Sequence, residues 1–298
     1  MSESAQFKVL SDSDIKLKAG EPLRSMYKLS PFAWRGGDEF QILVRAVNRD
    51  DDPAKKIARI YHGRSDDGLM FQMDSDPDIT PGPDADDAHG CEDPTVAEVN
   101  GQLYVYYSGW NQDRKIGKLM MACGPNPCSL QKRGVAISST PDHQNPKEAT
   151  IAQRRDGTWV LFFEYARDDR SRIGLATSKD VAGPWQVGED PIIARDSGWD
   201  SWHVSPGPLI AYNGRPLIFY NGSAKKLAWR IGWAILDDEF ESVAARGEAP
   251  LITPPPPKGE DTDIAFAASA VASDDETWLY YSIADRQMKR AVLQKLSH

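Results

Sequence analysis

Short runs of apolar and aromatic residues recur along this chain at nearly constant spacing. One position in each run, listed here in chain order, is separated from the next by 63, 56, 57 and 61 residues: Val44, Tyr107, Phe163, Tyr220 and Tyr281. Each run is four or five residues long, and several lack polar positions altogether. A run of that length and composition is typical of a strand that is buried on both faces.

Turn residues precede each run, and Gly, Asn and Asp are the residues that tolerate positive φ in hairpins. The five turns are Arg35-Gly36-Gly37-Asp38, Asn100-Gly101, Asp156-Gly157, Asn213-Gly214 and Ser273-Asp274-Asp275. Another apolar segment comes before each turn, and a third strand follows most of the runs. Five repeats of three or four antiparallel strands, with no long amphipathic helix, predict an all-β fold, a five-bladed β-propeller.

The repeat also predicts how the chain is organised. We expect one domain over residues 1–298, with residues 1–27 as a lead-in. The expected blades cover residues 28–80, 90–137, 146–194, 202–252 and 262–296. Two β-sandwiches split near residue 140 are the competing interpretation, which is disfavoured because the repeat runs through that point.

Charge and composition remove several classes of function. With 35 Lys and Arg against 44 Asp and Glu, the net charge of −9 disfavours nucleic acid and anionic lipid as partners. No stretch approaches the roughly 18 apolar residues of a membrane span, and the first residues carry no apolar export segment, so we expect a cytoplasmic protein. Cys123 and Cys128 flank Gly-Pro-Asn-Pro, which favours a structural loop over a metal or redox site. We expect no cofactor and no metal.

Charged residues gather where the innermost strand of each blade would begin. Those five segments are Leu29–Phe32, Gly90–Pro94, Pro146–Ala149, Trp202–Pro206 and Asp261–Ile264. In a propeller these starts converge on one end of the central channel, so they predict a funnel lined with carboxylates, a Lys and a His. Carboxylates beside aromatic rings are the equipment of glycoside cleavage, in which one acid protonates the leaving oxygen and a second group directs the attacking species.

Each candidate also has a purely structural interpretation. Asp93 before Pro94 is common in turns, and His203 between Trp202 and Val204 is compatible with a packed histidine. Of the tryptophans near the funnel, we expect one to contact sugar, and Trp202 is the candidate. The predicted catalytic residues are Asp93, Glu148 and Glu164. The predicted substrate-binding residues are Arg45, Glu92, Lys147, His203, Asn221, Asp263, Asp285 and Trp202.

Taken in order, several motifs resemble glycoside hydrolase family 130, the five-bladed propellers that include β-mannoside phosphorylases and some β-mannosidases. The resemblance covers nearly the whole chain and rests on Leu43–Ala46, Gly90–Pro94, Ser205–Ile210 with Tyr220–Gly222, Gly232–Asp237, and Tyr280-Tyr281 followed by Ala284-Asp285. It implies that Asp93 is the general acid, delivering its proton through a sugar hydroxyl, and that the nucleophile attacks from the opposite face with inversion. Arabinanase-like and fructosidase-like propellers fit less well, because Ser30-Pro31-Phe32 carries no acid where those families place one.

Two departures from the family pattern bear on the nucleophile. Thr95 stands where the phosphorylases usually have Arg, and Asn221 stands where they usually have His. Because phosphate needs cationic donors, these neutral residues together with Glu164 favour water, with Glu148 or Glu164 as base. We therefore expect an inverting, exo-acting glycosidase on a small β-mannoside or related oligosaccharide. The alternatives are a phosphate-dependent β-mannoside phosphorylase and a non-catalytic sugar-binding propeller. The oligomeric state stays open.

Overall fold

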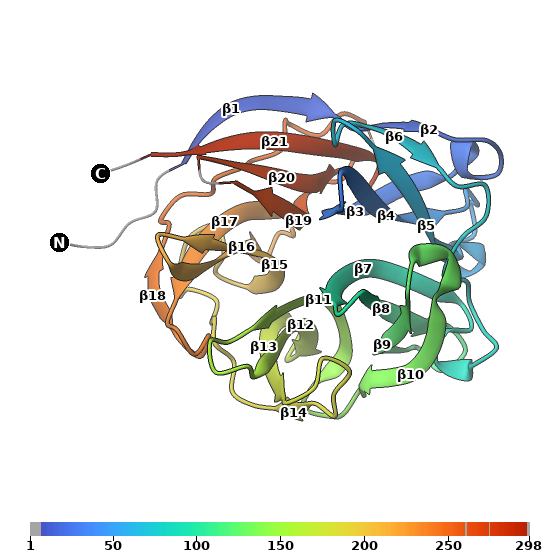
Figure 1. Cartoon of the computed structure of the whole chain (residues 1–298). Coiled ribbons are helices and arrows are strands. Elements are labelled where there is room, and N and C mark those ends of the chain that lie inside the picture. The colour runs from blue at the N-terminus through green and yellow to red at the C-terminus, as the bar shows by residue number, and fades with distance from the viewer. Residues whose placement is uncertain (1–6, 260, 274, 297–298) are drawn as a thin grey trace.

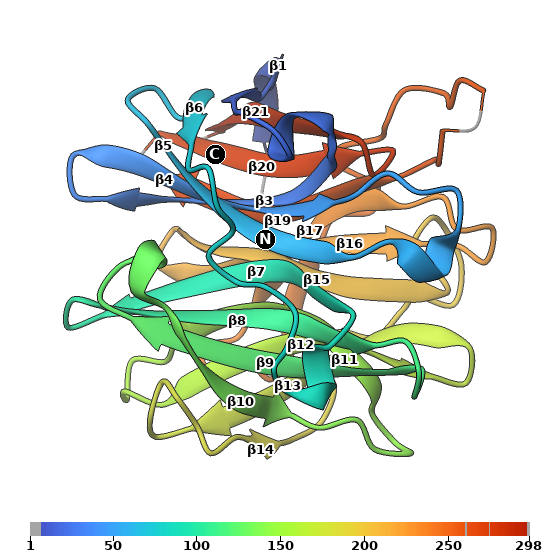
Figure 2. The same ribbon diagram turned by 90° about the vertical axis from the view of Figure 1, so that its right-hand side faces the viewer.

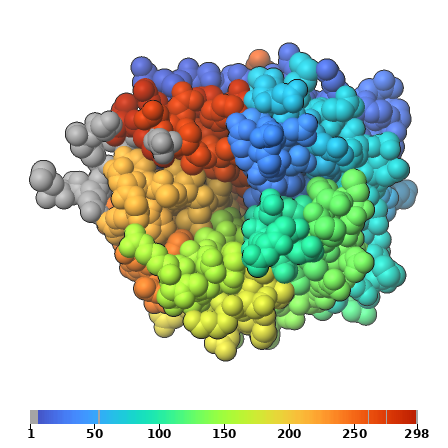
Figure 3. Space-filling view, viewed as in Figure 1, coloured from blue at the N-terminus to red at the C-terminus, as the bar shows by residue number. Residues whose placement is uncertain are grey.

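Antiparallel sheets arranged around a common centre make up the molecule. The computed structural model describes residues 7–259, 261–273 and 275–296. Figure 1 looks along the centre, with the sheets following one another in chain order, and Figure 2 shows the same sheets from the side. In the space-filling view of Figure 3 the segments follow one another around the same centre. The structure confirms the predicted five-bladed β-propeller.

Each blade contains four strands in antiparallel order, counted outward from the centre. Blade 1 consists of β3 (Tyr27–Gly36), β4 (Glu39–Val47), β5 (Ala58–Ser65) and β6 (Met70–Met73), with β2 (Lys16–Lys18) beside β6. Blade 2 consists of β7 (Gly90–Val99), β8 (Gln102–Asn111), β9 (Ile116–Gly124) and β10 (Gln131–Ile137). Blade 3 consists of β11 (Gln144–Gln153), β12 (Trp159–Arg167), β13 (Arg170–Ser178) and β14 (Gln186–Val187). Blade 4 consists of β15 (His203–Tyr212), β16 (Arg215–Ser223), β17 (Arg230–Leu236) and β18 (Val243–Arg246). Blade 5 consists of β19 (Ala265–Ala272), β20 (Glu276–Ile283), β21 (Gln287–Lys295) and β1 (Phe7–Asp14).

Among the described residues, helical structure is confined to four short 3₁₀ turns, η1 (Leu23–Ser25), η2 (Pro53–Lys55), η3 (Ala85–Asp87) and η4 (Pro127–Ser129). Within the described part of the chain no helix has the length and apolar character needed to cross a membrane. A single pair between Ala58 and Gly90 joins the sheets of blades 1 and 2 into one continuous sheet. Since only one residue pair makes this link, we count the two blades separately.

The N-terminal segment differs from the expected lead-in. Residues 7–14 form the outermost strand of blade 5, because β1 pairs with β21 from Phe7 opposite Lys295 to Asp14 opposite Lys289. The pairing of β1 with β21 thus completes the sheet of blade 5 and closes the ring of blades. Sequence alone cannot show this, since the pairing joins residues almost 300 positions apart. Residues 1–6 of the lead-in and Asp274 of the last predicted turn lie outside the described residues.

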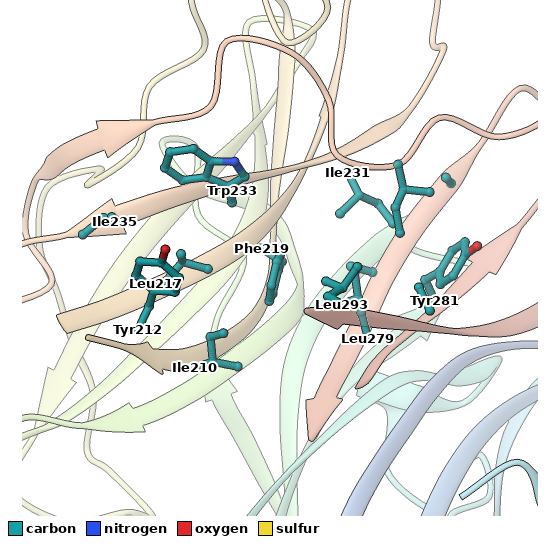
Figure 4. Packing of buried hydrophobic residues seen from close by; sticks show 14 of the residues in the cluster. Ile210, Tyr212, Leu217, Phe219, Ile231, Trp233, Ile235, Leu279, Tyr281 and Leu293 are labelled. Carbon is teal, nitrogen blue, oxygen red and sulfur yellow. The ribbon is translucent and has the colours of Figure 1, made fainter. Parts of the chain in front are cut away.

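The hydrophobic core lies between adjacent blades, which explains why the second strands are apolar on both faces. Val160 to Phe163 of β12 are all fully buried. Figure 4 shows the packing of blade 4 against blade 5, where Phe219 of β16 lies near Leu279 of β20 and Leu293 of β21. Burying large side chains of this kind contributes about 1.5–3 kcal/mol each. The ring is therefore a continuous packed core around a narrow polar centre.

In every blade, the innermost strand carries a β-bulge in its first half. The pairing register of the innermost strand shifts after Leu29 in β3, Glu92 in β7, Lys147 in β11, Pro206 in β15 and Ala267 in β19. A bulge bends its strand and re-aims the local side chains. Residues from all five bulges line one small void in the central channel, so the five bulges converge there. The residue types at the bulges therefore determine which chemical groups line this ring.

Side chains link adjacent blades at this ring. Thr150 of blade 3 donates to the Gly207 carbonyl of blade 4 at 2.8 Å, and Ser269 of blade 5 donates to the Pro31 carbonyl of blade 1 at 2.9 Å. Between blades 4 and 5, the Asn221 amide oxygen accepts from the Ala267 N–H at 2.7 Å. Three of the five junctions are thus held by neutral side chains bonded to backbone.

Candidate active site

A cavity of about 470 Å³ opens where the innermost strands begin, and every blade contributes to its lining. It shares Ser30, Asp93 and Glu148 with the small void in the ring of bulges. Seven of the predicted site residues line it: Arg45, Asp93, Lys147, Glu148, Glu164, His203 and Asp285. Four of these seven, Asp93, Lys147, Glu148 and His203, come from the inner-strand starts, so the expected convergence is present for these four.

Three residues at the bulges of blades 1–3 have a backbone conformation that is uncommon outside glycine. The φ angles are 51° for Ser30, 49° for Asp93 and 50° for Glu148. Left-handed residues of this kind persist only where the surrounding structure holds them, and they cluster at functional sites. The bulges thus turn a hydroxyl and two carboxyl groups from three adjacent blades toward one point.

Asp93 is the most constrained of these groups. It is buried, its Oδ1 accepts a hydrogen bond from the Ser30 hydroxyl at 2.6 Å, and Arg45 Nη1 lies 3.1 Å from the same oxygen. Burial acts to raise the pKa of Asp93, but the Arg45 charge and the Ser30 hydrogen bond outweigh it and lower that pKa below its usual range. Arg45 also contacts Glu92, with 2.9 Å between Nη2 and Oε2. Asp93 is therefore held as the carboxylate.

Glu148 is in the opposite state. Burial and the neighbouring charge of Asp93 raise the pKa of Glu148 well above its ordinary value, and the two side chains are hydrogen bonded to each other. Ionising both neighbouring carboxyl groups at once is unfavourable, so the resting pair holds one proton. That proton resides on Glu148, which donates to Asp93. This makes the fourth and fifth junctions ionisable: Ser30 to Asp93 between blades 1 and 2, and Glu148 to Asp93 between blades 2 and 3.

Glu164 supplies a separate carboxylate on the second strand of blade 3. It is buried, Lys147 Nζ lies 3.4 Å from its Oε1, and the Ser171 hydroxyl donates to the same oxygen at 2.9 Å. The charge of Glu164 raises the pKa of Lys147, so Lys147 stays an ammonium. The Ser171 hydrogen bond and the Lys147 ion pair, both on one oxygen, hold the carboxylate in the lining of the cavity.

His203 lines the cavity as a neutral ring. Its Nδ1 accepts a hydrogen bond from the Ser171 N–H at 3.0 Å, and burial lowers the pKa of the ring. A neutral imidazole whose Nδ1 accepts must carry its proton on Nε2, which makes His203 a donor. The ring packs against Trp229, with 5.6 Å between centroids.

Asp285 enters the cavity from the turn that follows β20, and its φ is 52°. Burial raises the pKa of this carboxyl, and the Arg45 charge opposes the rise. Its place beside the catalytic candidates fits the expected substrate contact.

Four predicted site residues do not line the cavity. Glu92 pairs with Arg45, and Asp263 pairs with Arg230 at 2.9 Å. Asn221 is fully buried, and its amide bonds to backbone groups of Pro206 and Ala267. The guanidinium of Arg170 lies 3.8 Å from the Trp202 ring centroid, and Lys225 Nζ lies 4.7 Å from it. For Asn221 the sequence expectation of sugar contact differs from the structure because the amide satisfies buried backbone at a blade junction.

Sequence reasoning missed several lining residues. Ser30 lacks a charge, yet it occupies in blade 1 the bulge position that Asp93 occupies in blade 2, and both precede a proline. That shared position in the repeat was the available signal. Trp229, rather than Trp202, is the tryptophan in the cavity, and it packs edge-to-face on Phe266 at 5.3 Å. No motif marks Trp229 or Ser171.

One side-chain group among the described residues has metal-ligating geometry. Asp74, Asp78 and Cys128 offer ligand atoms within 4.8 Å of one another, outside the cavity lining. Asp74 is already engaged by His62, with 2.7 Å between Oδ2 and Nδ1. We assign no role to this group.

Two curated proteins align with most of the chain. β-1,2-Mannobiose phosphorylase from Thermoanaerobacter sp. (strain X514) is 24% identical over 273 residues, covering 87% of each protein. 1,2-β-Oligomannan phosphorylase from the same organism is 24% identical over 263 residues, covering 86% of each.

Solved structures share the fold. β-1,2-Mannobiose phosphorylase from Listeria innocua, in complex with β-1,2-mannobiose, has a TM-score of 0.77 at 18% identity, covering 96% of this chain and 91% of that one. A second structure is described as belonging to family 130 of mannoside phosphorylases, in which glycoside hydrolases target β-1,2-mannosidic linkages in Candida mannan. It has a TM-score of 0.77 at 22% identity, covering 90% of this chain and 84% of that one.

The model of glycoside hydrolase family 130, described as β-1,4-mannooligosaccharide phosphorylase, matches residues 37–295. That match covers most of the chain, and it agrees with the propeller and with the motifs that carry the resemblance. The chain belongs to glycoside hydrolase family 130 and is an enzyme of that family.

Proposed function

We propose that this enzyme cleaves a terminal β-mannosidic bond with inversion and that water is the acceptor. The observation that carries the proposal is the Asp93–Glu148 pair, which holds one proton, beside a separately oriented carboxylate, Glu164, in a single cavity. The mannoside class follows from the relatives, two of which are named for β-1,2-linked mannosides.

The acid side of the reaction belongs to the pair. Glu148 first passes its proton to Asp93, and Asp93 delivers that proton to the leaving oxygen as the glycosidic bond breaks, by way of a sugar hydroxyl as the family resemblance implies. Arg45, 3.1 Å from Asp93 and 2.9 Å from Glu92, offsets the negative charge that this transfer leaves behind. Two carboxyl groups whose environments push their pKa values apart are the usual sign of such acid–base work.

The base side belongs to Glu164. Lys147 and Ser171 hold one of its oxygens, and a water bound to this carboxylate gives up a proton as it attacks the anomeric carbon. An inverting pair of carboxyl groups leaves room for that water. Because Asp93 comes from blade 2 and Glu164 from the second strand of blade 3, the two groups approach the sugar from different blades.

Phosphorolysis is the second candidate function. It is favoured by the names of both curated relatives and by the description of the family model. Against it stands the charge pairing of the cavity, since Arg45 is engaged by two carboxylates and Lys147 by Glu164. A phosphate dianion placed beside Glu164 would meet a carboxylate with the Lys147 charge already offset.

The test is a product analysis with β-1,2- and β-1,4-mannobiose in phosphate-free buffer and in phosphate. We expect free mannose as product at a rate that phosphate leaves unchanged, and proton NMR should show the new anomeric centre first as α. Mannose 1-phosphate formed in proportion to phosphate would replace this proposal with phosphorolysis. A first product in the β configuration would contradict inversion.

A further inference from the structure

The two sides of the cavity differ in chemistry. Blades 1–3 contribute most of the charged groups described above, and Asp285 of blade 5 and the neutral His203 of blade 4 lie in the same lining. Blades 4 and 5 also contribute a group of neighbouring apolar and aromatic residues, here called the apolar wall: Leu227, Trp229, Ile264 and Phe266. Trp229 and Phe266 pack edge-to-face at 5.3 Å, which fixes both rings. An aromatic ring can stack on the face of a sugar, but the aliphatic side chains of Leu227 and Ile264 form no hydrogen bonds with its hydroxyl groups, so this part of the wall needs a different explanation.

Leu227 is the unusual member of this wall. It lies in the loop that joins β16 to β17, 55% of its surface is exposed, and its φ is 57°. Leucine in this left-handed conformation is strained because its Cβ crowds the backbone, whereas Gly or Asn would adopt it readily. The turn is fixed by the Leu227 N–H, which donates to the Ala224 carbonyl at 3.1 Å. Because this leucine is both exposed and strained, it contributes little to the stability of the fold. A backbone outlier of this kind beside a cavity points to a functional contact.

The position of Leu227 indicates which part of a substrate it would contact. The proton-holding pair is buried, with Asp93 only 4% exposed, so the bond to be cleaved lies at the inner end of the cavity. Leu227 is open to solvent, so it lies toward the mouth, where the leaving group of a terminal sugar projects.

We propose that Leu227, Trp229 and Phe266 form a leaving-group subsite that binds an apolar or aromatic aglycone, so that the preferred substrates are β-mannosides whose leaving group presents an apolar surface. This inference rests on the proposed cleavage of β-mannosides. It adds a substrate class that the charged half of the cavity does not specify.

A series of alkyl β-mannosides tests the subsite, because methyl and hexyl leaving groups differ in apolar surface but barely in alcohol acidity. We expect kcat/KM to be roughly tenfold higher for the hexyl than for the methyl mannoside, from the apolar surface buried. Leu227→Asn, which keeps the left-handed backbone, should abolish most of this preference by lowering kcat/KM for the hexyl mannoside. Ile193→Asn is the matched control: Ile193 is 71% exposed, lies outside the cavity, and its replacement should preserve the preference.

Calorimetric binding separates this inference from the proposed function. In an Asp93→Asn background, hexyl β-mannoside should bind more tightly than methyl β-mannoside, and Leu227→Asn should remove the difference. Equal affinities for the two ligands, or a preference that survives Leu227→Asn, would overturn the subsite. If the preference in binding is present but the wild-type enzyme cleaves no β-mannoside, the subsite stands and the proposed function fails.

Discussion

The five junctions of the central ring use the same backbone device for two different purposes. Between blades 3 and 4, 4 and 5, and 5 and 1, neutral side chains of Thr150, Asn221 and Ser269 bond to backbone groups of the next blade. Between blades 1 and 2 and between 2 and 3, the junctions include ionisable groups: Asp93 accepts from Ser30 and Arg45 and pairs with Glu148.

The comparison shows that the bulges bring adjacent blades together at every junction of the ring. The residue types at each bulge then determine whether that junction contributes to stability or to catalysis. A neutral junction satisfies buried backbone and contributes to stability. An ionisable junction holds a proton and a strained backbone, which costs stability and serves chemistry. Substitutions at the two kinds of junction should therefore separate the two properties.

The largest effect is expected from Asp93→Asn. General acid catalysis is typically worth 10² to 10⁴-fold, so kcat on mannobiose should fall by about that factor. The fold should persist, since the replacement is nearly isosteric. Steady-state kinetics and thermal unfolding measure the two quantities. A variant that keeps more than about a tenth of the wild-type kcat would remove Asp93 from the acid side.

Glu148→Gln should change both the rate and its pH dependence. The pKa of Glu148 is raised and its protonated form is the active one, so wild-type kcat/KM should fall as pH rises through that pKa. The residual activity of Glu148→Gln should lack this alkaline limb. Persistence of the same limb in the variant would assign it to another group.

The same raised pKa has a consequence for stability. The stability that protonated Glu148 contributes is present below the pKa of the unfolded chain and is lost as pH rises through the folded pKa. Glu148→Gln should therefore be more stable than the wild type at alkaline pH, by urea unfolding at matched pH. Thr150→Val, at a neutral junction of the same blade, should show no such pH-dependent difference.

Asn221→Ala should have the opposite effects, with a loss of stability and little change in kcat. It leaves the Ala267 N–H and two carbonyl groups without their partner, and each unsatisfied buried group costs about 1–3 kcal/mol in the free energy of unfolding. The kcat of the folded fraction should stay close to the wild-type value. A large loss of kcat without loss of stability would show that Asn221 acts in catalysis after all.

Ser30→Ala should produce the smallest change. It removes the Ser30 hydrogen bond, one of the contacts that lower the pKa of Asp93, so that pKa rises and the acid limb of kcat/KM moves to higher pH. Ser269→Ala, which removes the neutral hydroxyl between blades 5 and 1, should leave the acid limb in place. Equal shifts in both variants would mean that the effect arises from ring geometry.

Much of the fold could be predicted because each repeat shows the same local pattern of apolar strands and turn residues. The apolar runs and the Gly and Asn turns give the blades, and Asp93-Pro94 and Ser30-Pro31 occupy equivalent places in that repeat. The closing role of residues 7–14 could not be predicted, since their partner strand is Gln287–Lys295 at the other end of the chain. Local sequence carries no record of such a pairing.

The site could be predicted in its residue types but not in its protonation. Asp93, Glu148 and Glu164 all line the cavity, and sequence offered no reason to place the proton on Glu148 rather than Asp93. That assignment depends on Arg45 and Ser30, which reach Asp93 from blade 1 only in the folded ring. Asn221 and Trp202 show the converse, since a polar or aromatic residue near the channel can contact neighbouring protein groups and not line the cavity.

The leaving-group dependence of the variants tests the central claim most directly. A dinitrophenolate departs without protonation, so a variant that lacks the acid should recover on 2,4-dinitrophenyl β-mannoside, whereas a variant that lacks the base should not. We predict that Asp93→Asn and Glu148→Gln regain most of the wild-type rate on this substrate but not on mannobiose, and that Glu164→Gln is impaired equally on both. Equal impairment of Glu148→Gln on the two substrates would contradict the shared proton of Asp93 and Glu148 as the acid of this site.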